Sequence, residues 1–303
     1  MHILLLGKNG QVGWELQRAL APLGTVTALD RHSADYCGDL TQPEALANTI
    51  RSLKPDVIVN AAAYTAVDKA ESEPIQARQV NADILAVIAI EANKLGAWLI
   101  HYSTDYVFNG EGASPWQEDD ISAPLSVYGA TKLAGENFIT QNCKQYLIFR
   151  TSWVYGSRGN NFAKIMLRLA KERDALSVIN DQVGAPTGAD LIADCTAHAV
   201  RIVMSSGSAQ AQSLAGIYHL AASGETNWHD YAALVFKEAR NHGVTLKLNN
   251  LNAISTVEYP TPASRPLNSR LNTEKLRTAF NLRLPPWQQG VSRMLTEILE
   301  QNS

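Results

Sequence analysis

The stretch "HILLLGKNGQVG", His2 to Gly13, decides the fold of this 303-residue chain. Its short run of apolar residues is typical of a strand that is buried on both faces of a parallel sheet. Glycines follow at Gly7, Gly10 and Gly13, where an amphipathic segment begins. In a strand–turn–helix unit, such glycines permit a tight turn, a close approach of main-chain N–H groups to a pyrophosphate, and close helix–strand packing. The stretch predicts a dinucleotide-binding turn; the alternative is a glycine turn in an arbitrary α/β protein.

Similar strands recur through the first half of the chain, as "TVTALD", "DVIVNAAA", "AWLIHYST" and "YLIFRTSW", with helical patterns between them. This alternation predicts an α/β protein with a Rossmann-like, doubly wound parallel sheet. We expect an NAD(P)-binding domain over residues 1–152. Residues 153–303 should form mainly a smaller α/β substrate-binding lobe, and some of their elements can return to the sheet. The small residues from Ser205 to Gly216 predict an exposed loop.

Composition excludes several classes of protein. With 26 basic and 29 acidic residues, the chain has no basic excess, so we expect no nucleic-acid binding. The cysteines, Cys37, Cys143 and Cys195, are odd in number and far apart, which argues against disulfides and zinc sites. The apolar run at the N-terminus is too short for a membrane span or an export signal. We therefore expect a cytoplasmic protein that does not bind membranes.

Polar residues at the ends of the predicted strands are candidates for cofactor binding. Asp30 ends the second strand, near the spacing expected for an acid that binds a ribose 2′-hydroxyl. Arg31 follows and can accept the extra phosphate of NADPH, so the pair leaves the choice between NADPH and NADH open. The "GDL" at residues 38–40 should end a third strand, where Asp39 can meet the adenine amino group. "NAAAYT", residues 60–65, should end the fourth, where small side chains let a cofactor lie against the main chain.

A second group of residues indicates proton chemistry. Tyr128 and Lys132 of "YGATK" lie one helical turn apart, and Thr104 follows the strand in "HYSTDYVF". Because a nearby cation favours the phenolate, we expect Lys132 to lower the pKa of Tyr128 from its usual value near ~10. Thr104 can then donate to a substrate carbonyl or to the tyrosine oxygen. Alone, the Tyr–Lys pair is equally typical of a solvated helix face, but with the glycine turn it predicts carbonyl reduction.

Six segments, in order along the chain, carry a resemblance: "GKNGQVGWEL", "NAAAYTAVDKAE", "YSTDYVFNG", "PLSVYGATKLAGE", "FRTSWVYG" and "INDQVGAPT". The chain resembles the extended short-chain dehydrogenase/reductase superfamily and, within it, the dTDP-4-dehydrorhamnose reductase family, over essentially its whole length. The resemblance implies NAD(P)H-dependent reduction of the 4-keto group of dTDP-4-dehydro-L-rhamnose to dTDP-L-rhamnose. That reaction is the last step of dTDP-rhamnose biosynthesis, which supplies lipopolysaccharide O-antigen or another cell-surface polysaccharide.

The resemblance also implies roles for residues. Tyr128 would be the proton donor, Lys132 its tuner and an anchor for the cofactor ribose, and Thr104 its hydrogen-bonding partner. Thr104, Asp105 and Trp153 would contact the sugar, although a lone tryptophan after a strand is usually a core residue. Arg265 of "SRP" could pair with the diphosphate or be an ordinary surface arginine. The implied cofactor-binding residues are Gly7, Gly10, Gln11, Val12, Gly13, Asp30, Arg31, Asp39, Leu40, Ala61, Ala62, Ala63, Tyr64, Thr65, Tyr102, Tyr128 and Lys132.

The resemblance further implies a homodimer and Mg²⁺ bound by acidic side chains at the dimer contact. The matching positions are Glu15, Asp190 and Glu297, for which unbound surface carboxylates are the alternative. Two other functions stay open. One is a non-catalytic binding protein, because the regulatory subunit of methionine adenosyltransferase resembles the same family. The other is a nucleotide-sugar epimerase or dehydratase, which would retain NAD⁺ through each cycle and consume no reduced cofactor.

Overall fold

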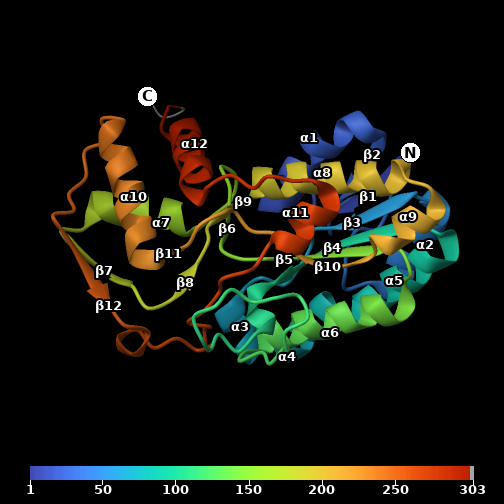
Figure 1. Ribbon diagram of the computed structural model, residues 1–303, viewed down its shortest axis with the longest axis horizontal. Coiled ribbons are helices and arrows are strands. Elements are labelled where there is room, and N and C mark those ends of the chain that lie inside the picture. The colour runs from blue at the N-terminus through green and yellow to red at the C-terminus, as the bar shows by residue number, and fades with distance from the viewer. Residues whose placement is uncertain (301–303) are drawn as a thin grey trace.

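The computed structural model describes residues 1–300, and a parallel sheet dominates the half of the molecule that contains the N-terminus (Figure 1). The six strands lie in the order β10-β5-β4-β3-β1-β2, and every neighbouring pair is parallel. This arrangement confirms the predicted fold class. The strands are β1 (His2–Leu6), β2 (Thr25–Leu29), β3 (Val57–Asn60), β4 (Trp98–Thr104), β5 (Tyr146–Thr151) and β10 (Gly216–His219).

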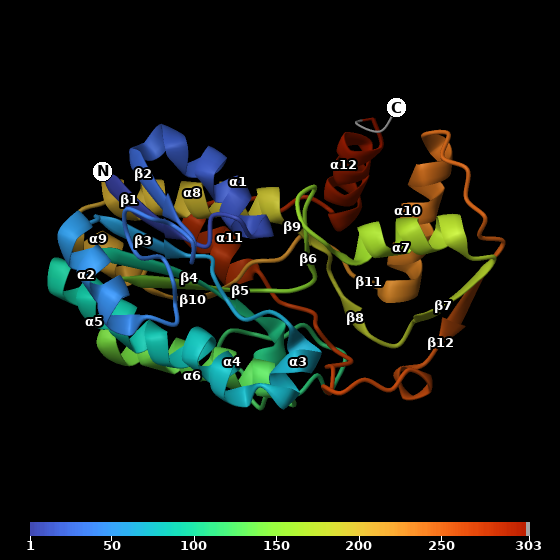
Figure 2. The same cartoon turned by 180° about the vertical axis from the view of Figure 1, so that it is seen from behind.

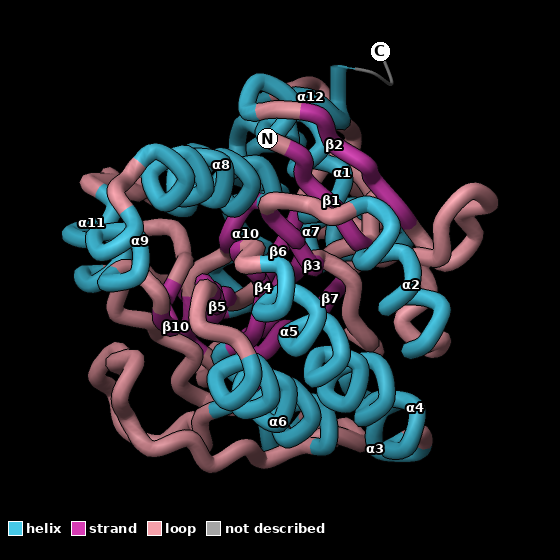
Figure 3. The backbone as a smooth tube through the Cα atoms, turned by 90° about the vertical axis from the view of Figure 1, so that its right-hand side faces the viewer, coloured by secondary structure: helices cyan, strands magenta, loops and turns pink. Residues whose placement is uncertain are grey.

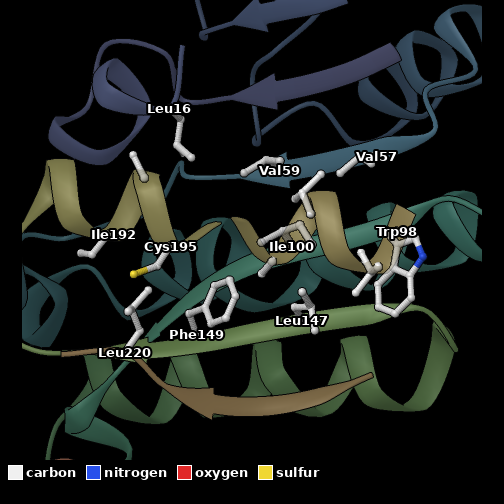
Figure 4. Close-up of a cluster of buried hydrophobic side chains, with 14 of the residues drawn as sticks. Leu16, Val57, Val59, Trp98, Ile100, Leu147, Phe149, Ile192, Cys195 and Leu220 are labelled. Carbon is white, nitrogen blue, oxygen red and sulfur yellow. The ribbon is translucent and has the colours of Figure 1, made fainter. Parts of the chain in front are cut away.

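Helices cover both faces of this sheet (Figure 3). Successive residues of a strand point to opposite faces, and apolar strand residues need cover on both. Ile3 and Leu5 pack on one side, and Figure 4 shows part of that cluster, including Leu16, Ile192 and Phe149. Leu4 and Leu6 pack on the other side. The helices of the first layer are α1 (Gln11–Leu20), α8 (Ala189–Ser205), α9 (Ser208–Ser213) and α11 (Glu274–Phe280), and those of the second are α2 (Pro43–Leu53), α5 (Ile84–Leu95) and α6 (Val127–Asn142).

The rest of the chain forms a second part of the molecule (Figure 2). This part has its own cluster of buried apolar side chains. Strand β7 (Ala175–Ile179) pairs with β12 (Asn250–Ile254), β6 (Val154–Tyr155) with β9 (Thr187–Gly188), and β8 (Val183–Gly184) with β11 (Thr226–Asn227). Strand β10 belongs to the six-stranded sheet and α8 packs on it, although both come after residue 153. The chain therefore returns to the first part of the molecule, a possibility that the sequence left open. The helices of this part are α7 (Phe162–Glu172), α10 (Trp228–Asn241) and α12 (Trp287–Glu300).

Two local predictions are wrong. Residues 38–40 form no strand, because the Asp39 carboxylate accepts hydrogen bonds from Thr41 and Gln42 nearby in the chain, and such local bonds compete with a strand ladder. The strands predicted as fourth and fifth are thus β3 and β4. The supposed loop from Ser205 to Gly216 contains α9, whose Ala211 is buried in the core.

Between β3 and α5 lie α3 (Val67–Ser72), α4 (Pro74–Arg78) and a π-helical turn, η2 (Gln79–Asp83). Within residues 1–300, no helix combines the length and apolarity that crossing a membrane would require.

Candidate active site

The glycine turn between β1 and α1 has the predicted local structure. Gly7 has a φ of 89°, and a Cβ at Gly13 would lie 2.0 Å from the carbonyl oxygen of Gly7, so only glycine fits where helix and turn meet. At Gly10, the nearest protein atom to an added Cβ would be 3.5 Å away. Protein packing therefore does not demand a glycine at this position, whereas a pyrophosphate cradled on the main chain would. These residues fit a dinucleotide.

Asp30 lies just beyond β2, beside this turn. Its carboxylate accepts hydrogen bonds from the N–H of His32 at 2.9 Å, from the hydroxyl of Ser33 at 3.1 Å, and from the side chain of Asn9. Partial burial would raise the pKa of Asp30, but these bonds and the charge of Lys8 outweigh it and lower the pKa. An ionised acceptor at this strand end can bind a ribose hydroxyl. Arg31 is exposed next to it.

The loop after β2 brings Asp39 close to Arg31. Partial burial would raise the pKa of Asp39, but hydrogen bonds from Thr41 and Gln42 and the charge of Arg31 together lower it. Leu40 is buried among the apolar side chains beneath α2. The loop thus carries one anchored acid and one exposed base near the sheet edge, although it reaches that edge without the predicted strand.

The segment Ala61–Thr65 leaves β3 and runs against the glycine turn. A Cβ at Gly7 would lie 2.7 Å from the main-chain nitrogen of Ala62, so the two segments are in contact. Asn81 holds Tyr64 on both sides, accepting from its N–H at 2.8 Å and donating to its carbonyl at 3.0 Å. Tyr102 differs from the other candidates: its ring lies in the core beneath α1 and α8, and its hydroxyl is 2.8 Å from that of Thr196. Only its main chain faces the candidate active site.

The candidate catalytic side chains meet where β4 ends and α6 begins. The hydroxyl of Ser126 accepts a hydrogen bond from the N–H of Gly129, and this cap fixes the first turn of α6, which carries Tyr128. The hydroxyl of Thr104 donates to Oδ1 of Asp105 at 3.0 Å and lies close enough to Tyr128 to act on the pKa of its hydroxyl. The structure thus brings the predicted threonine and tyrosine together.

The expected effect of Lys132 on Tyr128 is wrong for this structure. Burial raises the pKa of Tyr128 to about 12, and the hydrogen bond with Thr104 offsets only part of that rise. Nζ of Lys132 lies against β4 instead, 2.6 Å from the carbonyl oxygen of Tyr102 and 3.1 Å from Nε2 of His101. Burial lowers the pKa of Lys132 to about 8, against the opposing charge of Glu136.

His101 and Asn60 are site residues that the sequence reading missed. Nδ1 of His101 lies 3.2 Å from the side-chain nitrogen of Asn60, and both side chains are about 1% exposed. The oxygen of the Asn60 side chain accepts from the N–H of Ala62, so a buried polar chain joins Lys132 to the turn after β3. The available signal was the presence of polar residues within strands that are otherwise apolar on both faces.

Asp105 is prepared to accept a further hydrogen bond. Its side chain is 2% exposed, and its Oδ2 has no hydrogen-bonding partner among the described residues. Burial raises its pKa to about 6, although hydrogen bonds with Ser269 and Thr104 oppose the shift. An unsatisfied buried oxygen is costly, and a ligand hydroxyl would remove that cost. The chemistry of this position suits a sugar.

Trp153 has features of a core residue and also of a residue that contacts a ligand. Its ring is half-buried and stacks on Trp228, with 3.7 Å between ring centroids. Nε1 of Trp228 donates to the side chain of Gln182 at 3.0 Å. Trp153 also has a φ of 49°, a left-handed conformation that is costly for a bulky residue and often found at ligand sites. A Cβ at Gly184 would lie 2.9 Å from its ring, so the motif "QVGAPT" leaves room for the indole.

Comparison with known proteins identifies the family. The family model described as RmlD substrate binding domain matches residues 1–300. dTDP-4-dehydrorhamnose reductases of Shigella flexneri and Escherichia coli are each 64% identical over 298 residues, covering 98% of both chains. The chain belongs to the dTDP-4-dehydrorhamnose reductase family. A Bacillus anthracis dTDP-4-dehydrorhamnose reductase, crystallised with NADP, has a TM-score of 0.86 and 34% identity, with 98% of this chain and 99% of that chain covered. As a member of this family, the chain is an NAD(P)H-dependent oxidoreductase.

Arg265 has a partner within the chain. One of its terminal nitrogens lies 2.9 Å from Oδ2 of Asp68 in α3, and the other, although buried near Tyr106, has no hydrogen-bonding partner among residues 1–300. The ring of Tyr106 in turn meets the ring of Tyr128 edge-on, with centroids 5.6 Å apart. The guanidinium therefore links the second part of the chain to the aromatic surroundings of Tyr128.

The three acids predicted to bind magnesium, Glu15, Asp190 and Glu297, line one small pocket. Within one chain, they do not fit a cation. Arg293 occupies that pocket with them, 3.7 Å from Asp190 and 3.4 Å from Glu297, and Glu15 pairs with Arg18 at 3.4 Å. No group of three or more histidine, cysteine or acidic side chains within residues 1–300 could hold a metal ion. A guanidinium among the acids already neutralises the charge that a cation would neutralise.

Proposed function

We propose that this chain catalyses the NAD(P)H-dependent reduction of the 4-keto group of dTDP-4-dehydro-L-rhamnose to dTDP-L-rhamnose. The observation that carries the proposal is the meeting of Thr104, Asp105 and Tyr128 at the end of β4. All three lie at the carboxyl edge of a parallel sheet, where ligands of open α/β sheets bind. The high identity to reductases of this name supports the choice of substrate.

Tyr128 acts in this proposal as the donor of a proton to the former carbonyl oxygen. A pKa of about 12 keeps its hydroxyl protonated across the neutral range, as a donor requires. Thr104 would orient the hydroxyl, and it would favour the phenolate that remains after the transfer by turning its proton from Asp105 to Tyr128. The reduced nicotinamide, when bound, supplies the hydride. Asp105 and Trp153 hold the sugar through its hydroxyl groups and its ring face.

The cofactor would lie along the edge formed by the glycine turn, Asp30 and the segment Ala61–Thr65. Gly10, Gln11 and Val12 would bind the pyrophosphate through their main chain. Asp30 would accept from the ribose hydroxyl of NADH, and exposed Arg31 would receive the phosphate of NADPH. Asp39 and Leu40 would border the adenine, and Lys132 would anchor the nicotinamide ribose. Both reduced cofactors should therefore serve.

We further propose a cytoplasmic homodimer whose product supplies a cell-surface polysaccharide, with residues 1–152 binding mainly the cofactor and 153–303 mainly the sugar. The resemblance to the reductase family supports these points. Magnesium is not part of the proposal, because Arg293 pairs with Asp190 and Glu297.

Replacing Tyr128 by phenylalanine tests the assigned reaction. With the dTDP-4-keto-6-deoxy sugar as substrate, NADPH oxidation should fall about 10²–10⁴-fold, the usual contribution of general acid catalysis. The dissociation constant for NADPH should stay within about twofold, because the ring is kept. Tyr146→Phe, in β5, is the matched control and should keep full activity. Near wild-type turnover in Tyr128→Phe would refute the role of this hydroxyl.

The wild-type protein separates the other candidate functions. A binding protein would bind NADPH and turn over no sugar. An epimerase or dehydratase would convert the sugar without consuming reduced cofactor in equal amount. One NADPH oxidised for each sugar reduced is the outcome that the proposal requires.

A further inference from the structure

A cavity of about 750 Å³ lies beside α11, outside the candidate active site. Thr104, Asp105, Tyr128 and Trp153 are absent from its lining. Its volume is within the range of roughly 300–1,000 Å³ that is typical of small-molecule sites. The chemistry proposed above uses none of the residues that form it.

The segment over residues 268–272 separates the cavity from the candidate active site. The side chain of Ser269 lies beside the ring of Trp153, because a Cβ at Gly184 would be 3.1 Å from the one and 2.9 Å from the other, whereas its neighbour Arg270 lines the cavity. Neighbouring residues of an extended segment point in opposite directions, and bridges at Asn268 and Leu271 show that this segment is extended. Gly184 also separates the cavity from the candidate active site. It lines the cavity, and a Cβ added to it would point toward the ring of Trp153.

The charge of the cavity is opposite in sign to that of the chain. The chain has a formal net charge of −3, yet the lining carries three arginines, Arg270, Arg277 and Arg283, and one acid, Glu225. Arg270 donates to Glu225 at 2.7 Å. Arg277 and Arg283 have no side-chain hydrogen bond or ion pair to any residue within 1–300, so two guanidinium groups are left for an anion. Guanidinium groups bind phosphate oxygens in pairs of parallel hydrogen bonds.

The remaining lining is largely apolar. Leu271, Leu282 and Leu284 are part of this lining, together with Ala185 and Ala222, and Leu284 is only 4% exposed. An inorganic anion would leave these apolar residues exposed to water, whereas a nucleotide, with its sugar and planar base, would cover them. We propose that the cavity is a second binding site for a nucleoside diphosphate, with the diphosphate on Arg277 and Arg283 and the base against the leucines.

The test counts nucleotide sites per chain. Equilibrium dialysis of thymidine diphosphate against the full-length protein, saturated with NADPH so that the cofactor site is filled, should give two sites in the wild type. One is the sugar-nucleotide site of the proposed function, and the other is this cavity. The double variant Arg277→Gln/Arg283→Gln should retain one site, with affinity at the lost site reduced at least tenfold. Arg173→Gln/Arg201→Gln, two exposed arginines elsewhere, is the matched control and should retain two.

Trp153→Ala keeps the two proposals apart, because it should lose the sugar-nucleotide site and keep the cavity site. If the proposed function fails, the wild type should bind one nucleotide that only the Arg277/Arg283 variant loses. A single wild-type site that this variant retains would overturn the inference, as would no binding at all. Pyrophosphate that competes for the cavity as strongly as thymidine diphosphate would also overturn it, because the leucines would then contribute nothing.

Discussion

The buried lysine on α6 makes a quantitative prediction about stability. The pKa of Lys132 falls from 10.5 to about 8 because its side chain is only 2% exposed. The difference of 2.5 units, at about 1.4 kcal/mol per unit, means that holding the cation in the fold costs about 3 kcal/mol at neutral pH. Lys132→Met removes that cost. It also removes two hydrogen bonds, to Tyr102 and His101, worth about 1 kcal/mol each. The variant should therefore be about 1 kcal/mol more stable at pH 7, while losing its anchor for the cofactor.

The pH dependence identifies the cause. Below pH 8 the lysine is charged in both the folded and the unfolded chain, so the cost is constant. Between pH 8 and 10.5 the unfolded chain binds more protons at this lysine than the folded chain, so wild-type stability rises with pH. At pH 9.5 roughly 2 kcal/mol of the cost is relieved. The advantage of Lys132→Met should therefore shrink by that amount and change sign, since methionine does not titrate.

Urea unfolding at pH 7 and pH 9.5, followed by circular dichroism, measures both free energies of unfolding. Lys237→Met, at an exposed position of α10, is the control. Its difference from the wild type in free energy of unfolding should be the same at the two pH values. Comparing variant and wild type at each pH cancels the titration of other groups, including Tyr128. A stability difference that is equal at pH 7 and pH 9.5 would show that Lys132 has an ordinary pKa and carries no such cost.

Three further variants test the cofactor edge and the core. Asp30→Ala should raise the dissociation constant for NADH more than that for NADPH in a fluorescence titration; equal increases would mean that this carboxylate does not bind the ribose hydroxyl. Gly13→Ala places a methyl group 2.0 Å from the carbonyl oxygen of Gly7 and should abolish NADPH binding with a lower Tm; unchanged binding would contradict the close packing. Glu136→Gln breaks the 2.7 Å ion pair with Arg150, whose side chains are 2% and 4% exposed, and should cost about 3–5 kcal/mol in urea unfolding. A loss below about 1 kcal/mol would show that water reaches this pair.

The sheet and the glycine turn could be predicted from the sequence because their signals are local. Apolar runs and glycine spacing are set by neighbouring residues, and β1, β3, β4 and β5 follow them closely. The false strand at residues 38–40 shows the limit, since a side-chain hydrogen bond from Asp39 to Thr41 decides that segment and leaves no apolar pattern. Likewise, the buried residue of α9 is a single alanine, Ala211, which no pattern distinguishes within a run of small residues.

The direction of a side chain is harder to predict than its position. The four-residue spacing places Tyr128 and Lys132 on one face of α6, but the amine turns toward β4 because a carbonyl and a histidine there accept it. Tyr102 follows His101 directly in β4, yet the alternation of the strand directs its ring into the core, on the face opposite to the contact of His101 with Lys132. The stack of Trp153 on Trp228 joins residues 75 positions apart, so no local pattern could indicate it.

The edge position of β10 bears on how the chain can be made and divided. This strand pairs with β5 although 64 residues separate the end of β5, at Thr151, from the start of β10, at Gly216. A nascent chain that has emerged only to residue 152 would present β5 as an open edge with unpaired N–H and carbonyl groups, a template for pairing with other chains. Such non-local pairing is also slow to form. The first half of this protein is therefore a poor candidate for expression alone, and its synthesis should have a window of aggregation that closes only when residues 216–219 arrive.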